Sequence, residues 1–275
     1  AWLGQVAHLT GNSAHALALY DTARAVQQQL QQARPGESVR LRDLAVIESR
    51  RAEALQALGR RDEAIAARQA AVTWMHQTLV DGASNAFWQA ESLLADSALL
   101  LAQADAGRPI DAQLAALQRR LASAGKGKED MREWRQSVMQ TRLAVAGQAM
   151  RTRDWAAARA AASSVAQDVR SLMAQYPFLW QGRELQARAD LLLLQADASA
   201  ADGSYPAALC RATRNALQPA IDTGQAGFVR EAWLVARACA GEGAVTGADV
   251  KTLTQGGYRP QSSAFLNAVP IRNAP

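Results

Sequence analysis

Two histidines come closer to a metal-binding pattern than any other residues of this sequence. His8 and His15 flank the first of several turns, so a helix hairpin at that turn brings both imidazoles to one end. A zinc site needs three or four ligands in fixed geometry, and no nearby cysteine or carboxylate pair completes the set. His76 stands alone and is typical of a surface or packing residue. We therefore expect no metal and no cofactor.

The two cysteines, Cys210 and Cys239, lie in consecutive predicted helices that fold back through residues 222–224. Counting outward from that turn places Cys210 opposite residues near 235, within about one helical turn of Cys239. A disulfide across this hairpin is therefore geometrically feasible, and two buried free thiols are the alternative. Because disulfides persist in oxidising compartments, a bond would indicate a location outside the cytoplasm.

The sequence contains no recognisable catalytic constellation. It lacks a glycine-rich phosphate loop, a nucleophile elbow and a histidine pair with an acid between. Kinase motifs are absent too, so any phosphoryl transfer would belong to another part of a longer polypeptide. Asp190 and Asp197, two turns apart on one predicted helix, have the spacing of paired carboxylates, but solvated or groove-lining charges explain them better. We expect this segment to be non-catalytic.

Composition and charge exclude several classes of protein. The 275 residues are 49% hydrophobic and 20% charged, which excludes a mainly disordered chain. Basic residues number 30 and acidic residues 25, but arginines alternate with acids, as in residues 60–63. A nucleic-acid surface needs basic residues gathered on one face, so we expect no nucleic-acid partner. No apolar run approaches the roughly 20 residues that cross a bilayer, so we expect no membrane span.

A repeat of nearly constant length organises the chain. Five turns follow an apolar helix end and precede an alanine-rich helix, and their aligned residues are Gly11, Gly59, Gly107, Arg153 and Gly203. The separations are 48, 48, 46 and 50 residues. Five residues after each turn stand Ala16, Ala64, Ala112, Ala158 and Ala208, and seven residues before stand Gly4, Ala52, Leu100, Ala146 and Ala196. Short side chains at all of these places except Leu100 predict closely packed helix hairpins.

Hydrophobic period and turn residues predict an all-α fold. The expected helices span residues 2–10, 13–33, 38–58, 62–80, 85–105, 109–123, 129–151, 154–175, 178–201, 205–221 and 225–240. Residues 1–241 form the predicted repeat array, and residues 242–275 form a predicted irregular tail with room for a short helix at 247–255. Tyr258, Phe265 and Leu266 of that tail either lie in the groove of the array or cap its last apolar face.

This pattern resembles the tetratricopeptide repeat, on the residues WLGQVAHLTGNSAHALALYDTARAV at 2–26 and AEALQALGRRDEAIAARQAAV at 52–72. The resemblance implies a right-handed α-solenoid of about five helix-turn-helix units. The period is longer than the family's usual length of about 34 residues, and Arg153 replaces a turn glycine. The segments at 33–55, with RDLAV, and 81–103, with NAFWQ, resemble long repeats that follow the kinase domain in bacterial Ser/Thr protein kinases of eukaryotic type.

Such a solenoid exposes a concave face, lined mainly by the first helix of each unit, that suits a peptide or partner helix. We expect it to comprise Gln5, His8, Ser49, Arg50, Glu53, Ser97, Leu101, Asp105, Met150, Arg151 and Asp197. These side chains mix both signs of charge. The predicted partner is therefore a protein or peptide, and a homodimer is also open.

The expected role is a non-catalytic sensory or protein-interaction domain of a larger bacterial signalling protein. Ala1-Trp2-Leu3 is typical of a helix interior, which suggests a piece of a longer polypeptide. The kinase resemblance implies the extracytoplasmic, periplasmic part of a transmembrane Ser/Thr protein kinase. The alternative is a cytoplasmic scaffold, or the effector domain of a transcriptional regulator.

Overall fold

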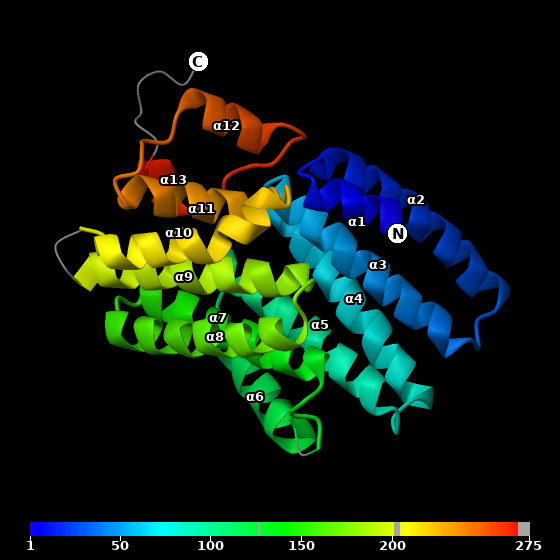
Figure 1. The fold of residues 1–275 in the computed structure, drawn as a ribbon. Coiled ribbons are helices and arrows are strands. Elements are labelled where there is room, and N and C mark those ends of the chain that lie inside the picture. The colour runs from blue at the N-terminus through cyan, green and yellow to red at the C-terminus, as the bar shows by residue number, and fades with distance from the viewer. Residues whose placement is uncertain (126, 201–203, 269–275) are drawn as a thin grey trace. The chain divides into compact units, whose positions relative to one another are not determined.

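The computed structural model describes residues 1–125, 127–200 and 204–268, which form thirteen α-helices and no β-strand (Figure 1). The helices are α1 (Trp2–Leu9), α2 (Ser13–Ala33), α3 (Ser38–Ala57), α4 (Arg61–Asp81), α5 (Ala86–Asp105), α6 (Asp111–Gly125), α7 (Arg132–Arg151), α8 (Trp155–Gln175), α9 (Trp180–Ala200), α10 (Ala207–Asp222), α11 (Phe228–Cys239), α12 (Gly247–Thr254) and α13 (Ser263–Ala268). The all-α prediction is confirmed. For the first twelve helices, the ends agree with the predicted ends within three residues.

Two compact units divide the chain. Unit 1 comprises Ala1–Ala7 and Ser13–Ala144, and unit 2 comprises His8–Asn12 and Val145–Pro275, so the boundary crosses α1 and α7. In unit 1, the helices from α2 to α6 each pack against the next. In unit 2, α8 packs on α9, and α11 contacts α9, α10, α12 and α13.

Left-handed residues end the first helix of the hairpins where the repeat predicts them. Three of these residues are Gly11 (φ 89°), Gly59 (φ 74°) and Gly107 (φ 73°). After α3, the N–H of Arg60 donates to the carbonyl of Leu55 at 2.9 Å, which satisfies a carbonyl that the helix end would otherwise leave unpaired. Glycine suits this conformation because it has no Cβ to clash with the backbone. The fifth predicted turn residue, Gly203, lies outside the described residues.

The fourth turn reaches the same geometry without glycine. Arg153 has φ 61°, and the N–H of Asp154 donates to the carbonyl of Ala149 at 2.9 Å. The Asp154 carboxylate then accepts a hydrogen bond from the N–H of Ala157 at 3.0 Å and so caps the start of α8. The hairpin is therefore kept, and Arg153 bears the cost of a left-handed backbone.

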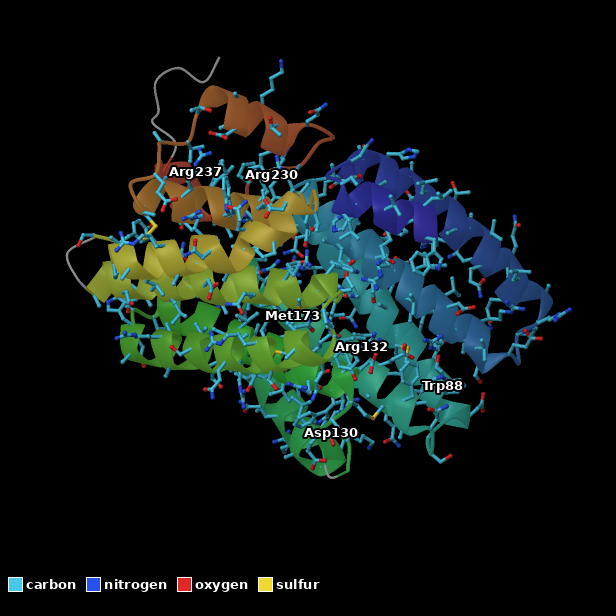
Figure 2. All side chains as sticks on the ribbon, viewed as in Figure 1. Trp88, Asp130, Arg132, Met173, Arg230 and Arg237 are labelled. Atoms are coloured by element: carbon cyan, nitrogen blue, oxygen red, sulfur yellow. A yellow bond between two sulfur atoms is a disulfide. The ribbon has the colours of Figure 1, made fainter. Side chains whose placement is uncertain are left out.

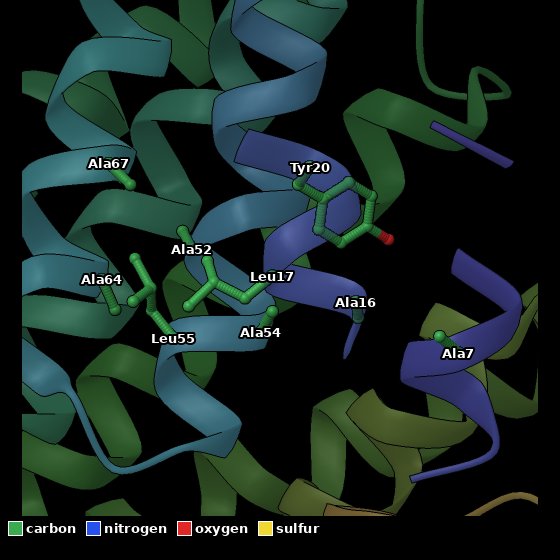
Figure 3. Packing of buried hydrophobic residues seen from close by; sticks show 9 residues of the cluster. All are labelled: Ala7, Ala16, Leu17, Tyr20, Ala52, Ala54, Leu55, Ala64 and Ala67. Atoms are coloured by element: carbon green, nitrogen blue, oxygen red, sulfur yellow. The ribbon is translucent and has the colours of Figure 1, made fainter. Parts of the chain in front are cut away.

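The residues seven positions before the turns are buried in all five hairpins. They are Gly4, Ala52, Leu100, Ala146 and Ala196. At Gly4, an added Cβ would lie 2.7 Å from Cε1 of Tyr20, so only glycine lets α1 approach α2 this closely. Tyr20 belongs to a cluster of buried side chains from α1, α2, α3 and α4 in unit 1, most of them alanine or leucine (Figure 3).

The alanine column after the turns is only partly buried, which corrects the expectation from the sequence. Ala16, Ala64 and Ala158 are buried, whereas Ala112 and Ala208 are exposed. The buried alanines are the fourth residues of α2, α4 and α8, while the exposed ones are the second residues of α6 and α10. Pro109 and Pro206 precede these two helices and delay their start.

Residues after α11 continue the packed structure of unit 2. The carboxylate of Glu231, which is fully buried, accepts hydrogen bonds from the hydroxyl of Tyr258 (2.6 Å) and from the N–H groups of Gln261 (2.8 Å) and Ser262 (2.6 Å). Tyr258 and Phe265 are buried. α12 occupies the short helix expected at 247–255, and α13 was not expected. The domain boundary between residues 241 and 242 stays a prediction.

Replacing Arg153 by glycine should stabilise unit 2. A left-handed residue with a Cβ costs roughly 1–2 kcal/mol, and glycine's extra freedom in the unfolded chain offsets part of the gain. We expect Arg153→Gly to raise the free energy of unfolding by about 0.5–1 kcal/mol, measured by urea denaturation. As a control, Ala160→Gly, at an exposed position inside α8, should lower it by about 1 kcal/mol. A loss of stability in Arg153→Gly would contradict the backbone assignment.

Candidate interaction surface

The predicted concave-face residues are divided between the two units. Unit 1 holds Gln5, Ser49, Arg50, Glu53, Ser97, Leu101 and Asp105, and unit 2 holds His8, Met150, Arg151 and Asp197. A continuous face through all of them therefore stays a prediction. Within each unit, burial and hydrogen bonds distinguish the open residues from the covered ones.

Ser97 and Leu101 of α5 are buried, with 0% and 8% of their surfaces exposed, so the structure does not place them on an open surface. The Ser97 hydroxyl donates to Oε1 of Gln140 in α7 at 2.8 Å. α5 also packs against α4 and α6. Helical spacing alone did not reveal that α5 has neighbours on several sides, and this is why both residues were expected on the groove.

Arg50 and Glu53 belong to an ionic cluster on α3 and α4. Nη1 of Arg50 lies 3.1 Å from Oε2 of Glu53, and Nη2 of Arg68 lies 3.7 Å from Oε1 of the same carboxylate. Burial and the Glu53 carboxylate together raise the pKa of the Tyr20 phenol well above its ordinary value. Ser49 beside this cluster is half-buried.

Equivalent helices α3 and α5 are joined by polar contacts one repeat apart. Nε and Nη2 of Arg42 donate to the two oxygens of Glu91 at 2.6 and 2.7 Å. At the C-terminal ends of the same two helices, Nε2 of Gln56 donates to Oδ2 of Asp105 at 3.4 Å. Both pairs are 49 residues apart, which matches the repeat of 46 to 50 residues. The two helices therefore run in parallel and are linked by long side chains at repeat-equivalent positions.

Two partly exposed apolar side chains flank the Arg42–Glu91 pair. The Arg42 guanidinium lies over the ring of Phe87, 5.4 Å from its centroid, and 39% of Phe87 is exposed. Val46, one turn after Arg42 on α3, is 37% exposed. Arg42, Val46, Phe87 and Glu91 together are called the Arg42 surface below. Apolar groups beside a fixed ion pair suit contact with a protein partner.

Sequence reasoning missed the residues of the Arg42 surface. Phe87 lies within the NAFWQ stretch, and Arg42 and Val46 are the first and last residues of RDLAV, so the sequence marks them only as part of a family resemblance. The usable signal was their separation, because Arg42 and Glu91 stand one repeat apart with opposite charges on equivalent helices. Comparing charges at matching repeat positions would have found the pair.

The remaining candidate residues differ in how far they are exposed. Arg151 is exposed and Met150 is half-buried. His8 is half-buried with its ring edge-on to Trp180, 6.1 Å between centroids, while His15 is exposed. Among residues 1–125, 127–200 and 204–268, no group of three or more His, Cys, Asp or Glu side chains could hold a metal ion.

Asp190 and Asp197 of α9 have different partners. Oδ1 of Asp190 accepts a hydrogen bond from Nε2 of Gln186 at 2.7 Å, whereas Oδ1 of Asp197 lies 3.1 Å from Nε of Arg159. Burial raises the pKa of Asp190 to about 6, against the opposing effect of the Gln186 hydrogen bond. Each carboxylate therefore has a partner of its own.

The cysteines are joined. Cys210 of α10 and Cys239 of α11 form a disulfide with their Cα atoms 5.7 Å apart, drawn as a yellow bond in Figure 2. Two residues before Cys239 on α11, Arg237 donates from Nη2 to Oδ2 of Asp249 at 2.7 Å, which ties α12 to the same helix. The alternative of two buried free thiols is not what the structure contains.

Comparisons with known proteins identify no relative: no protein-family model matches the chain, and neither a curated protein nor a solved structure is significantly similar to it. No helix in the described part of the chain is both long enough and apolar enough to cross a membrane.

Asp190 should make unit 2 less stable as pH rises. Its folded-state pKa of about 6 exceeds the unfolded value, so the folded state binds the proton more tightly. The free energy of unfolding should therefore fall between pH about 4 and 6. Asp190→Asn should remove this slope and be about 1–3 kcal/mol more stable than the parent at pH 7, in urea titrations across pH.

Asp197→Asn serves as the control, because it loses a partly exposed ion pair and should destabilise by less than about 1 kcal/mol. An unchanged pH slope in Asp190→Asn would contradict the burial argument.

Proposed function

We propose that the chain is a non-catalytic protein-interaction domain of a larger bacterial signalling protein, and that it works as a sensory domain attached to a Ser/Thr protein kinase. In this proposal the helices form a tetratricopeptide-like solenoid that binds an extended peptide or partner helix. The domain supplies recognition, and the attached kinase supplies the chemistry.

The single observation that carries the proposal is the pairing of α3 with α5 at one repeat. Arg42–Glu91 and Gln56–Asp105 have the same separation of 49 residues. A third contact joins the α3–α4 hairpin to the α5–α6 hairpin. Nη2 of Arg108, in the turn between α5 and α6, lies 2.6 Å from Oδ1 of Asp62 at the start of α4, and the two residues are 46 positions apart. Such register is expected when hairpins of one length stack, and stacked hairpins line one face with their first helices.

The Arg42 surface is the part of that face on which we expect a partner to rest. Val46 and Phe87 offer apolar contact area from neighbouring first helices, and the Arg42–Glu91 pair is already ordered between them. A partner that contacts this surface loses little side-chain entropy from Arg42, because the guanidinium is held by Glu91 and by the Phe87 ring.

The disulfide favours the extracytoplasmic form of the proposal over the cytoplasmic alternative. Cys210 and Cys239 close a loop across the α10–α11 hairpin, and disulfides of this kind persist where the compartment is oxidising. A scaffold or transcriptional regulator in the cytoplasm would keep the same two thiols reduced.

Charging the Arg42 surface should abolish recognition without unfolding the domain. We expect the double variant Val46→Asp, Phe87→Asp to lose at least about tenfold in signalling response of the parent protein, because a carboxylate cannot rest on an apolar partner surface without desolvation. Val80→Asp, at the end of α4 and 79% exposed, is the matched control and should respond normally. Circular dichroism checks that all variants remain helical.

Equal responses from the double variant and the parent would exclude this surface as the recognition site. Normal signalling after removal of residues 1–241 would exclude the sensory role altogether.

The state of the cysteines in the cell tests the compartment. We expect both thiols to resist labelling by a polyethylene-glycol maleimide in the natively produced protein and to become reactive after reduction. Cys210→Ser with Cys239→Ser provides the unlabelled reference. Full labelling before reduction would favour the cytoplasmic alternative.

A further inference from the structure

Unit 2 contains a cavity of about 400 Å³ beside the disulfide. Its wall on the α11 side is formed by Val235, Ala238 and Cys239, of which Cys239 carries the disulfide to Cys210. This volume falls in the range of about 300–1,000 Å³ that is usual for small-molecule pockets. The cavity lies at the C-terminal end of α11, where the hairpin with α10 is covalently closed.

Small residues in the loop after α11 keep the cavity open. Gly241, Gly243 and Ala244 line it, and a Cβ built on either glycine would meet no other atom within 4 Å. Both glycines have positive φ, 77° and 114°, so the loop conformation itself disfavours larger residues there. The open space is therefore a consequence of backbone geometry as well as of residue size.

Two hydrogen-bonding side chains complete the lining. Tyr205 comes from the segment before α10, and Asn267 comes from α13. Within the described part of the chain, neither side chain has a hydrogen-bond partner. Burial raises the pKa of the Tyr205 phenol, which therefore keeps its proton near neutral pH and remains a donor. The carboxamide of Asn267 offers both a donor and an acceptor.

The lining residues in the described segments include no charged side chain. Gly241, Gly243, Ala244 and Asn267 are exposed, so the cavity is open to solvent on that side; a net charge on a ligand would lose part of its hydration beside Val235 and the disulfide and would gain no charged partner from these lining residues. An apolar ring fits against Val235, Ala238 and the disulfide, while a neutral polar group reaches Tyr205 and Asn267. We propose that this cavity binds a small uncharged ring compound that carries a hydrogen-bonding group.

This site lies outside the Arg42 surface and belongs to unit 2 alone. Its occupation does not depend on the proposed protein-binding role, and either proposal can fail without the other. If both hold, the domain receives a chemical input as well as a protein partner.

Three probes of nearly equal shape test the ligand class. Benzamide is uncharged, benzoate is an anion, and benzamidine is a cation at neutral pH. Titration calorimetry and saturation-transfer NMR on the oxidised 275-residue chain should detect benzamide with a dissociation constant on the order of 1 mM. Both charged analogues should bind at least about tenfold more weakly. Equal binding of a charged analogue, or no binding of benzamide, would overturn the proposal.

Variants locate the bound probe. Ala244→Phe and Ala238→Leu add side-chain volume to the lining and should abolish benzamide binding, whereas Ala248→Phe, on an exposed position of α12 outside the cavity, should not. Tyr205→Phe should weaken binding about threefold to tenfold, the value of one hydrogen bond. Circular dichroism and melting temperature establish that each variant is folded. Unchanged binding in both folded cavity-filling variants would place the probe elsewhere and refute the site.

Discussion

Close approach of paired helices at residues with short side chains is the constraint on which the first, second and fourth hairpins depend. Gly4 touches the Tyr20 ring, and Ala52, Ala64 and Ala158 are almost completely buried. Interiors are packed nearly as tightly as organic crystals, so one extra methyl group at such a contact must displace a helix. Hairpins of one length follow from these contacts, because the turn and the small residue stand at matching distances in each repeat.

Polar contacts add a second level of order between hairpins. The Arg42–Glu91 pair uses both carboxylate oxygens and is partly withdrawn from water, which makes its geometry more specific than that of a fully exposed ion pair. The same contact occupies charges that would otherwise be free to meet a partner directly. Recognition by unit 1 would therefore depend more on the apolar side chains beside the pair than on free charge.

In unit 2, a buried carboxylate and a disulfide fix α11 to its neighbours. A buried carboxylate, Glu231, collects three hydrogen bonds from the following segment, and a disulfide fixes the other end of the helix. Beyond the disulfide, the glycine-containing loop after α11 leaves space unfilled. The neighbouring hydrogen-bonding groups of Tyr205 and Asn267 give that space a chemical preference, which an alanine-lined void would lack.

Local periodicity and backbone preferences at positions such as Gly59 were enough to predict the first twelve helices, their approximate ends and four of the hairpin turns. The single short turn between two helices also limited the separation of Cys210 and Cys239 and so placed them near each other. Local signals could not reveal that Ser97 and Leu101 are covered, that Ala112 and Ala208 are exposed, or that Arg42 meets Glu91 over Phe87. Those outcomes depend on which helices from distant parts of the chain become neighbours, and the burial of a side chain is a property of that neighbourhood.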